Sequence, residues 1–227
     1  MSFFSRFRMT PELQTQVDSF IEIQNQLRSQ IKAVPLPNPV QRIAGCDSAF
    51  IGDHILSVFV IFSFPDLEEI EVQSNLAPVT IPYIPGFLSF REIPNLVTTY
   101  EKITVKPDII MVDGQGILHP RRLGIATHLG LLLQKPTLGV AKHKLFGRYQ
   151  EPGLKKGNIC PIFDHQEQLG YVVRSKNNVK PIFVSPGHLC TVDDALSLTL
   201  QTMRKHKLPE PTRVADYYSK FLKPAYL

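Results

Sequence analysis

Apolar side chains recur every three or four positions over residues 11–32, a spacing typical of one buried face of a helix. Thr10 and Pro11 suit a helix start, and three prolines at positions 35, 37 and 39 end the pattern. The chain is therefore predicted to begin with a helix and a short stiff connector. The apolar positions are Leu13, Val17, Phe20, Ile23, Leu27 and Ile31.

Three extended runs follow, over residues 41–50, 54–64 and 69–80. Short turn sequences separate them, Ile51-Gly52-Asp53 and Pro65-Asp66. The runs predict an antiparallel meander, and three strands in series seldom stand without a covering layer.

Helices and strands then alternate: a helix over residues 86–102, a strand over 107–112, a helix over 121–134 and a strand over 137–141. Such alternation predicts parallel pairing of the strands. Further extended runs cover residues 158–163, 169–174 and 180–184, before helices over 192–206 and 212–222. The fold class is α/β, with a mixed sheet in which a meander precedes parallel strands and helices flank the sheet.

The composition suits one globular domain spanning residues 1–227, because 43% of the residues are hydrophobic and 20% are charged. Disordered chains are poorer in apolar residues. Lys and Arg outnumber Asp and Glu by 25 to 20, and the resulting net charge of +5 mildly favours a polyanionic partner such as nucleic acid.

The cysteines and the apolar runs indicate the compartment. Cys46, Cys160 and Cys190 are far apart and form no CxxC pair, which argues against a zinc or redox motif and favours a reducing setting. Met1–Arg8 lacks the apolar stretch of a leader, and no run reaches the roughly 18 apolar residues of a membrane span. The chain is expected to be a soluble cytoplasmic protein with no membrane partner.

Three carboxylates fall at informative places: Asp47 in the first strand, Glu92 in the helix after the meander, and Asp113 where the next strand ends. If the first and fourth strands run side by side and parallel, Asp47 and Asp113 become neighbours. The intervening helix can then bring Glu92 to the same point. Because converging carboxylates repel one another, such a site calls for a cation. Oxygen-only ligands favour a hard ion such as Mg²⁺, and a pair of such ions can drive phosphodiester hydrolysis.

Five ordered blocks of residues resemble the endonuclease V family of deoxyinosine 3′ endonucleases, and the resemblance covers most of the chain. The family has a ribonuclease H-like fold, and its members nick DNA or RNA near inosine. The blocks are Gly45-Cys46-Asp47, Pro82-Tyr83-Ile84-Pro85-Gly86 with Phe90-Arg91-Glu92, Asp113-Gly114-Gln115-Gly116 with His119-Pro120-Arg121, Gly139-Val140-Ala141-Lys142, and Ser185-Pro186-Gly187-His188.

The resemblance implies that Asp47, Glu92 and Asp113 hold Mg²⁺, with Mn²⁺ as a substitute. It further implies cleavage of the second phosphodiester bond 3′ to the lesion, which leaves a 3′-OH and a 5′-phosphate. Many ribonuclease H-like nucleases carry a fourth acidic ligand on the last helix, and Asp216 is the candidate for that place. Asp193 and Asp194 follow Thr191 and are instead expected to cap a helix.

Basic side chains near these carboxylates are further candidates. Lys142 ends a buried strand, where its charge can stabilise a scissile phosphate, and the resemblance assigns it that kind of catalytic role. His119 can donate a hydrogen bond to phosphate. Arg121 is expected at a helix start, where its charge opposes the helix dipole and suggests an anion nearby. His128 and His188 are expected to serve the core or the surface.

The segment Pro82-Tyr83-Ile84-Pro85 is a stiff loop with an aromatic tip, suited to wedging between bases. An enzyme that reads a damaged base must first turn it out of the stack. Gly86, Gly114, Gly116 and Gly139 are the expected walls of the pocket that receives it.

The predicted partner is DNA that contains deoxyinosine, bound by a monomer in DNA repair. Inosine-containing RNA remains an alternative, because no block reports a preference for a 2′-OH. A module that binds damaged or branched nucleic acid without cutting is a second alternative, although it would be expected to lack one of the carboxylates. A junction resolvase is a third, since fold does not fix substrate.

Overall fold

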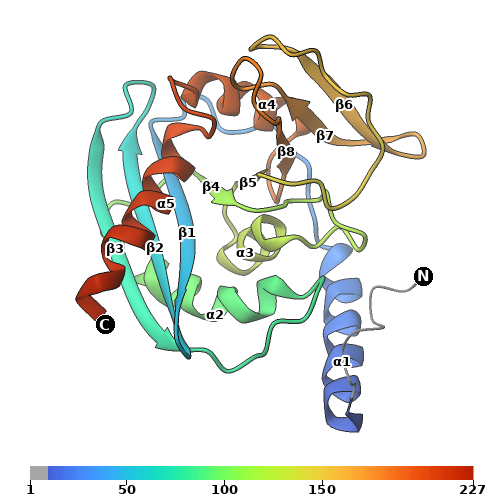
Figure 1. Cartoon of the computed structure of the whole chain (residues 1–227), viewed down its shortest axis with the longest axis vertical. Helices are drawn as coiled ribbons and strands as arrows, with labels where there is room; N and C mark the ends of the chain where they lie inside the picture. The colour runs from blue at the N-terminus through green and yellow to red at the C-terminus, as the bar shows by residue number, and fades with distance from the viewer. Residues whose placement is uncertain (1–9, 227) are drawn as a thin grey trace.

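The computed structural model describes residues 10–226, and Figure 1 shows their arrangement. The helices are α1 (Pro11–Arg28), α2 (Leu88–Glu101), α3 (Ile125–Leu133), α4 (Val192–Thr202), α5 (Glu210–Phe221) and the short 3-10 turn η1 (Lys223–Tyr226). The strands are β1 (Arg42–Ile51), β2 (His54–Ser63), β3 (Glu69–Pro78), β4 (Ile109–Asp113), β5 (Thr137–Ala141), β6 (Ile159–Asp164), β7 (Glu167–Val173) and β8 (Ile182–Pro186). Among the described residues, no helix has the length and apolar character that a membrane crossing requires. Met1–Arg8, where no leader was expected, lies outside this range.

Within residues 10–226 the strands form one eight-stranded sheet in the order β3-β2-β1-β4-β5-β8-β7-β6. Strands β1, β2 and β3 pair antiparallel, which confirms the predicted meander. Strand β4 pairs parallel with β5, as the alternation predicted, and β1 pairs parallel with β4, the condition under which Asp47 and Asp113 become neighbours. Beyond β5 the sheet becomes antiparallel again. The predicted mixed α/β fold is therefore confirmed, while the single-domain organisation stays a prediction.

Each face of the sheet carries its own hydrophobic core. On one face, Ile43 and Met111 pack with Val214 of α5 and Leu198 of α4. On the other face, Ile110 packs with residues of α2 and α3. Successive strand residues point to opposite faces, and residues 43–46 of β1 and 109–112 of β4 are all buried, so these parts of the two strands are covered on both faces. Figure 1 shows α5 crossing β1 and β2 on one side, with α2 and α3 beneath.

Helix α1 lies at the margin of the molecule, where its aromatic side chain Phe20 joins a small separate cluster. The Phe20 ring stacks on Phe90, with ring centroids 4.1 Å apart, and also contacts Phe87. Because Phe87 and Phe90 belong to the first turn of α2 and its N-cap, α1 is attached to the point where α2 begins.

Several predicted boundaries were wrong. The first helix ends at Arg28 rather than at residue 32. The helix predicted over residues 121–134 begins at Ile125, because the preceding residues form a turn in which the Arg122 N–H donates to the His119 carbonyl at 2.9 Å. Arg121 therefore does not stand at a helix start, and its charge does not oppose a helix dipole there as predicted. The helix predicted to residue 206 ends at Thr202, where the backbone becomes extended.

Gly45 in β1 lets α5 approach the sheet. A Cβ atom at this position would lie 1.9 Å from the Pro211 carbonyl oxygen, a separation that no pair of non-bonded heavy atoms tolerates. The absence of a side chain at residue 45 therefore fixes how closely the start of α5 packs on β1.

We expect Gly45→Ala to lower the free energy of unfolding by about 3 kcal/mol, because the added methyl group must push α5 away from β1. Gly52→Ala is the matched control: Gly52 has a φ of 58° but open space around its Cβ position. Its cost should be backbone strain alone, about 1 kcal/mol. Urea denaturation of both variants measures the difference, and equal losses would contradict the close-packing argument.

Candidate active site

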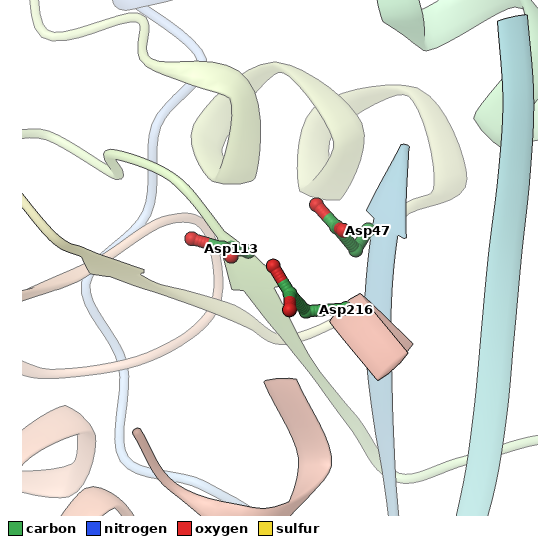
Figure 2. Close-up of side chains that lie close together, drawn as sticks. All are labelled: Asp47, Asp113 and Asp216. Atoms are coloured by element: carbon green, nitrogen blue, oxygen red, sulfur yellow. The ribbon is translucent and has the colours of Figure 1, made fainter. Parts of the chain in front are cut away.

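Three aspartates from distant parts of the chain meet at one place on the sheet. Asp47 lies in β1, Asp113 ends β4, and Asp216 lies in α5. Each offers a carboxylate oxygen, and these oxygens all lie within 4.8 Å of one another. The parallel pairing of Cys46 with Val112 brings the next residue of each strand to the same edge. Figure 2 shows the three side chains converging from these elements.

Glu92 lies on α2, which covers the face of the sheet opposite α5. It lies outside the set of three mutually close carboxylates. Burial, together with the charges of Asp47 and Asp113, raises the pKa of Glu92 to about 8. Glu92 is thus a buried neighbour of the three aspartates, and the structure brings all four predicted ligands into one region.

The pKa values of the three aspartates are shifted in different directions. Burial raises the pKa of Asp47 to about 6, with a second contribution from the charge of Asp113. Burial also raises the pKa of Asp113, against the opposing effect of Lys142. For Asp216, burial acts in the same direction, but hydrogen bonds from Lys220 and Lys142 outweigh it and lower the pKa.

Two lysines neutralise part of this charge. The Lys142 Nζ lies 2.6 Å from Asp113 Oδ2 and 3.0 Å from Asp216 Oδ1. Lys220 Nζ lies 2.5 Å from Asp216 Oδ2. Burial alone would lower the pKa of Lys142, yet the contacts with Asp113 and Asp216 raise it, so the ammonium group stays charged. An ammonium ion between two carboxylates shows that this place accommodates a cation.

The donor set fits a hard divalent ion. Asp47, Asp113 and Asp216 provide only oxygen ligands, which Mg²⁺ prefers, and the Ser219 hydroxyl donates to Asp47 Oδ2 at 2.9 Å and so helps to orient it. Ser219 and Lys220 were missed in the sequence, although their spacing of three and four residues from Asp216 places them on the same side of a helix.

A cavity of about 180 Å³ lies beside the cluster. Gly114 and Gln115, which directly follow Asp113 in the chain, form part of its wall. Gly86 lines it as predicted, and Tyr83 lies at it with 52% of its surface exposed. The start of α2 also faces it, and no side chain caps that helix end. The full lining is Tyr83, Gly86, Leu88, Ser89, Gly114, Gln115, His119, Leu123, Gly124, Ile125 and Leu145.

His119 lines this cavity and does not join the aspartates. Its Nδ1 accepts from the Arg121 N–H at 3.2 Å, so its proton is on Nε2, which donates to the Gly86 carbonyl at 3.2 Å. Burial lowers the pKa of His119 to about 4, and the nearby charge of Arg121 adds to the effect. Arg121 also turns inward, toward Gly86 and the ring of Phe87. The catalytic role of His119 and the substrate contact of Arg121 remain predictions.

Two of the expected pocket glycines, Gly116 and Gly139, do not line the cavity. A Cβ at Gly116 would lie 2.1 Å from the Pro186 carbonyl oxygen, and one at Gly139 would lie 2.5 Å from that of Gly114. These two residues therefore allow β5, β8 and the loop after Asp113 to pack closely. In the aromatic loop, Ile84 is buried with Phe20 and Phe87, while Pro82 is exposed.

The residues expected to be structural have structural contacts. His128 is buried, with its Nδ1 3.1 Å from the Ser89 hydroxyl, and His188 Nδ1 accepts from the Lys32 N–H at 3.3 Å. Thr191 and Asp194 form a reciprocal capping box at the start of α4, which confirms that Asp194 is a cap. Asp193 accepts from the Tyr171 hydroxyl at 2.9 Å.

Comparisons with known proteins cover nearly the whole chain. A family model described as endonuclease V matches residues 25–217. The endonuclease V of Petrotoga mobilis is 42% identical over 218 residues, covering 96% of each protein. The solved endonuclease V of Streptomyces avermitilis has a TM-score of 0.86 at 34% identity, over 92% of this chain and 94% of that chain. A variant of Ciona intestinalis endonuclease V, in complex with DNA containing an inosine followed by a ribo-adenosine, has a TM-score of 0.84 at 28% identity, over 96% of this chain and 100% of that chain.

The raised pKa values predict how Mg²⁺ should affect stability. The pKa of Asp47 rises from 3.8 to about 6 and that of Glu92 from 4.5 to about 8, so the folded state binds more protons than the unfolded state between these values. Without a divalent ion, stability should therefore fall as the pH rises from about 4 to about 8. Because Mg²⁺ competes with these protons, we expect its stabilising effect to be larger at pH 8 than at pH 6.

Thermal melts with and without Mg²⁺ at both pH values measure this effect. At pH 8, a Mg²⁺ concentration of 100 times the Kd at that pH should add about 2.7 kcal/mol, which is roughly 5–10 °C in Tm, and the same concentration should add less at pH 6. Asp113→Asn serves as the control and should lose most of the increase. An increase that does not depend on pH would argue against ion binding at these carboxylates.

Proposed function

Because the chain belongs to the endonuclease V family, we propose that it is a metal-dependent endonuclease that recognises inosine in nucleic acid and hydrolyses the second phosphodiester bond 3′ to it. The products are a 3′-OH and a 5′-phosphate, and the cellular role is DNA repair. One observation carries the proposal: three aspartate oxygens within 4.8 Å of one another stand directly beside a cavity whose wall continues from Asp113. Chemistry and base recognition thus have adjoining sites.

The residues that would hold the metal are Asp47, Asp113 and Asp216. Glu92 is close enough to interact electrostatically with Asp47 and Asp113, and its carboxylate would add to the negative charge around the ion. When bound, Mg²⁺ supplies activation of a water molecule and neutralisation of the leaving oxygen. Lys142 contributes a permanent charge beside the same carboxylates, where it can stabilise the negative charge that develops on the phosphate. We expect Mn²⁺ to substitute for Mg²⁺.

The cavity supports recognition of a base that has been turned out of the strand. Its mostly apolar lining suits the faces of a flat ring, and extrusion brings the base edge to backbone groups. At the start of α2 no side chain caps the backbone N–H groups of Leu88 and Ser89, whereas the Phe90 N–H donates to the Phe87 carbonyl at 3.1 Å. Deamination replaces the amino group of adenine by a carbonyl oxygen, which such donors can bind. An adenine amino group would leave these donors without an acceptor, so they favour inosine.

Other substrates and functions fit less well. The Ciona intestinalis complex contains a ribo-adenosine after the inosine, and this supports testing RNA as well as DNA. A module that binds without cutting has no need for four acidic residues around one point. A junction resolvase has no need for a base-sized side cavity. We propose that the protein acts as a monomer in the cytoplasm.

The direct test is to incubate the purified protein and Mg²⁺ with end-labelled DNA and RNA strands that contain inosine or adenosine. We expect one cut, at the second bond 3′ to the inosine, and no cut in EDTA. Asp113→Asn should remain folded and lose cleavage by at least about 1,000-fold, because a neutral amide cannot balance the charge of the ion. Cleavage in EDTA, or a wild-type rate for the folded variant, would overturn the assignment.

Tyr83 tests the proposed wedge. Its exposed ring can fill the gap left by an extruded base and recover part of the lost stacking, on the order of 1–3 kcal/mol. Tyr83→Ala should therefore weaken binding to inosine duplexes about tenfold, with a smaller loss on single strands, where little stacking is broken.

Affinities for single-stranded, duplex and mismatched inosine substrates measure this difference, together with a thermal melt. If Tyr83 only packs against its neighbours, affinity for every substrate should fall equally and in step with Tm. Such a uniform loss would exclude the wedge.

A further inference from the structure

One backbone carbonyl in the cavity wall, that of Gly86, receives three side-chain donors. Gln24 Nε2 lies 3.2 Å from this oxygen, His119 Nε2 lies 3.2 Å from it, and the Arg121 NH2 nitrogen lies 3.3 Å from it. The three side chains come from α1 and from the turn before α3, which are remote from Gly86 in sequence. A carbonyl oxygen commonly accepts one or two hydrogen bonds, so this peptide group is held unusually firmly.

Gly86 is a position that needs such support. Its φ of +83° is open to glycine but strained for other residues, and glycine also loses the most conformational freedom when it is fixed. The residue lines the cavity and lies two residues before the first turn of α2, which lines it as well. A rotation of the Gly86 peptide would therefore move both the cavity wall and the uncapped N–H groups behind it.

Gln24 and Arg121 support each other as well as Gly86. Arg121 Nε donates to Gln24 Oε1, while the amide nitrogen of Gln24 donates to Gly86. Gln24 is fully buried although it is polar, so each of its groups needs a partner. The guanidinium carbon of Arg121 also lies 4.8 Å from the centre of the Phe87 ring. The contacts of Gln24 and Arg121 with Gly86 and Phe87 therefore connect α1 to the start of α2.

We propose that Gln24 and Arg121 are positioning residues that fix the Gly86 peptide and so determine how well the cavity discriminates inosine from adenosine. This inference rests on the proposed function of the cavity as the base pocket. It gives α1 a role in specificity, although Gln24 lies just before the segment that the family model matches. Neither side chain has to touch the base, since both act through Gly86.

A purely structural role for Gln24 predicts a different result. If Gln24 only anchors α1, its replacement should lower stability and reduce all activities in proportion to the folded fraction. If it positions Gly86, discrimination should change in fully folded protein, while the affinity for Mg²⁺ should not. Val17→Ala provides the matched control, because Val17 is buried on the same helix and forms no part of the polar network.

The experiment measures single-turnover cleavage of inosine-containing and adenosine-containing strands, below the Tm of every variant and with Mg²⁺ titrations alongside. We expect Gln24→Leu to lower the ratio of inosine to adenosine cleavage about tenfold, or about 1.4 kcal/mol. Its Mg²⁺ affinity should match that of the wild type. Val17→Ala should lower Tm and leave the ratio unchanged. A wild-type ratio in Gln24→Leu, or an equal decrease in Val17→Ala, would overturn the proposal.

Gln24→Glu keeps the inference testable if Gln24→Leu does not fold. The glutamate retains an acceptor for Arg121 but cannot donate to Gly86, so the discrimination ratio should still fall. In a double-mutant cycle with Arg121→Lys, the two losses should be strongly non-additive, because both residues act on one peptide. Additive losses would contradict a shared network. Wild-type protein that does not cut inosine strands would refute the proposed function itself, a result distinct from variants that cut with unchanged discrimination.

Discussion

Repulsion between carboxylates is the constraint on which the active site depends. The parallel pairing of β1 with β4 brings Asp47 and Asp113 to one edge, and α5 adds Asp216 to the same point. Burial removes the water that would otherwise screen these charges, as the raised pKa of Asp47 and that of Glu92 indicate. Protons or other cations can relieve this repulsion, and the ammonium groups of Lys142 and Lys220 relieve part of it.

Close backbone packing around the site holds the aspartates in place. Helix α5 can approach β1 because residue 45 is glycine, and the loop after Asp113 can lie against β5 and β8 because residues 116 and 139 are glycines. Each of these contacts is between backbone atoms, which yield less than flexible side chains do. The positions of Asp113 and Asp216 are therefore set by rigid parts of the fold, as a site that binds a metal ion requires.

The two faces of the sheet contribute different residues to the site. Helix α5 covers one face and supplies Asp216, which contacts Lys220 of the same helix and Lys142 after β5. Helices α2 and α3 cover the other face, supply Glu92 and border the cavity. Under the proposed function, a nucleic-acid strand at the aspartates would place its inosine in the cavity beside them. The network around Gly86 links the cavity to α1, at the margin of the molecule.

The sequence by itself determined the order of the elements, because apolar periodicity is local and survives without tertiary contacts. It made Asp47 and Asp113 neighbours only on the condition that the first and fourth strands pair in parallel, and the tertiary structure decided that this pairing occurs. The direction of Arg121 could not be inferred. Its partners Gln24 and Gly86 lie 97 and 35 residues away in sequence, and no local pattern reports a hydrogen bond across such distances. For the same reason, the contact of Lys142 with Asp216, 74 residues apart, and the packing roles of Gly116 and Gly139 were decided by the tertiary structure alone.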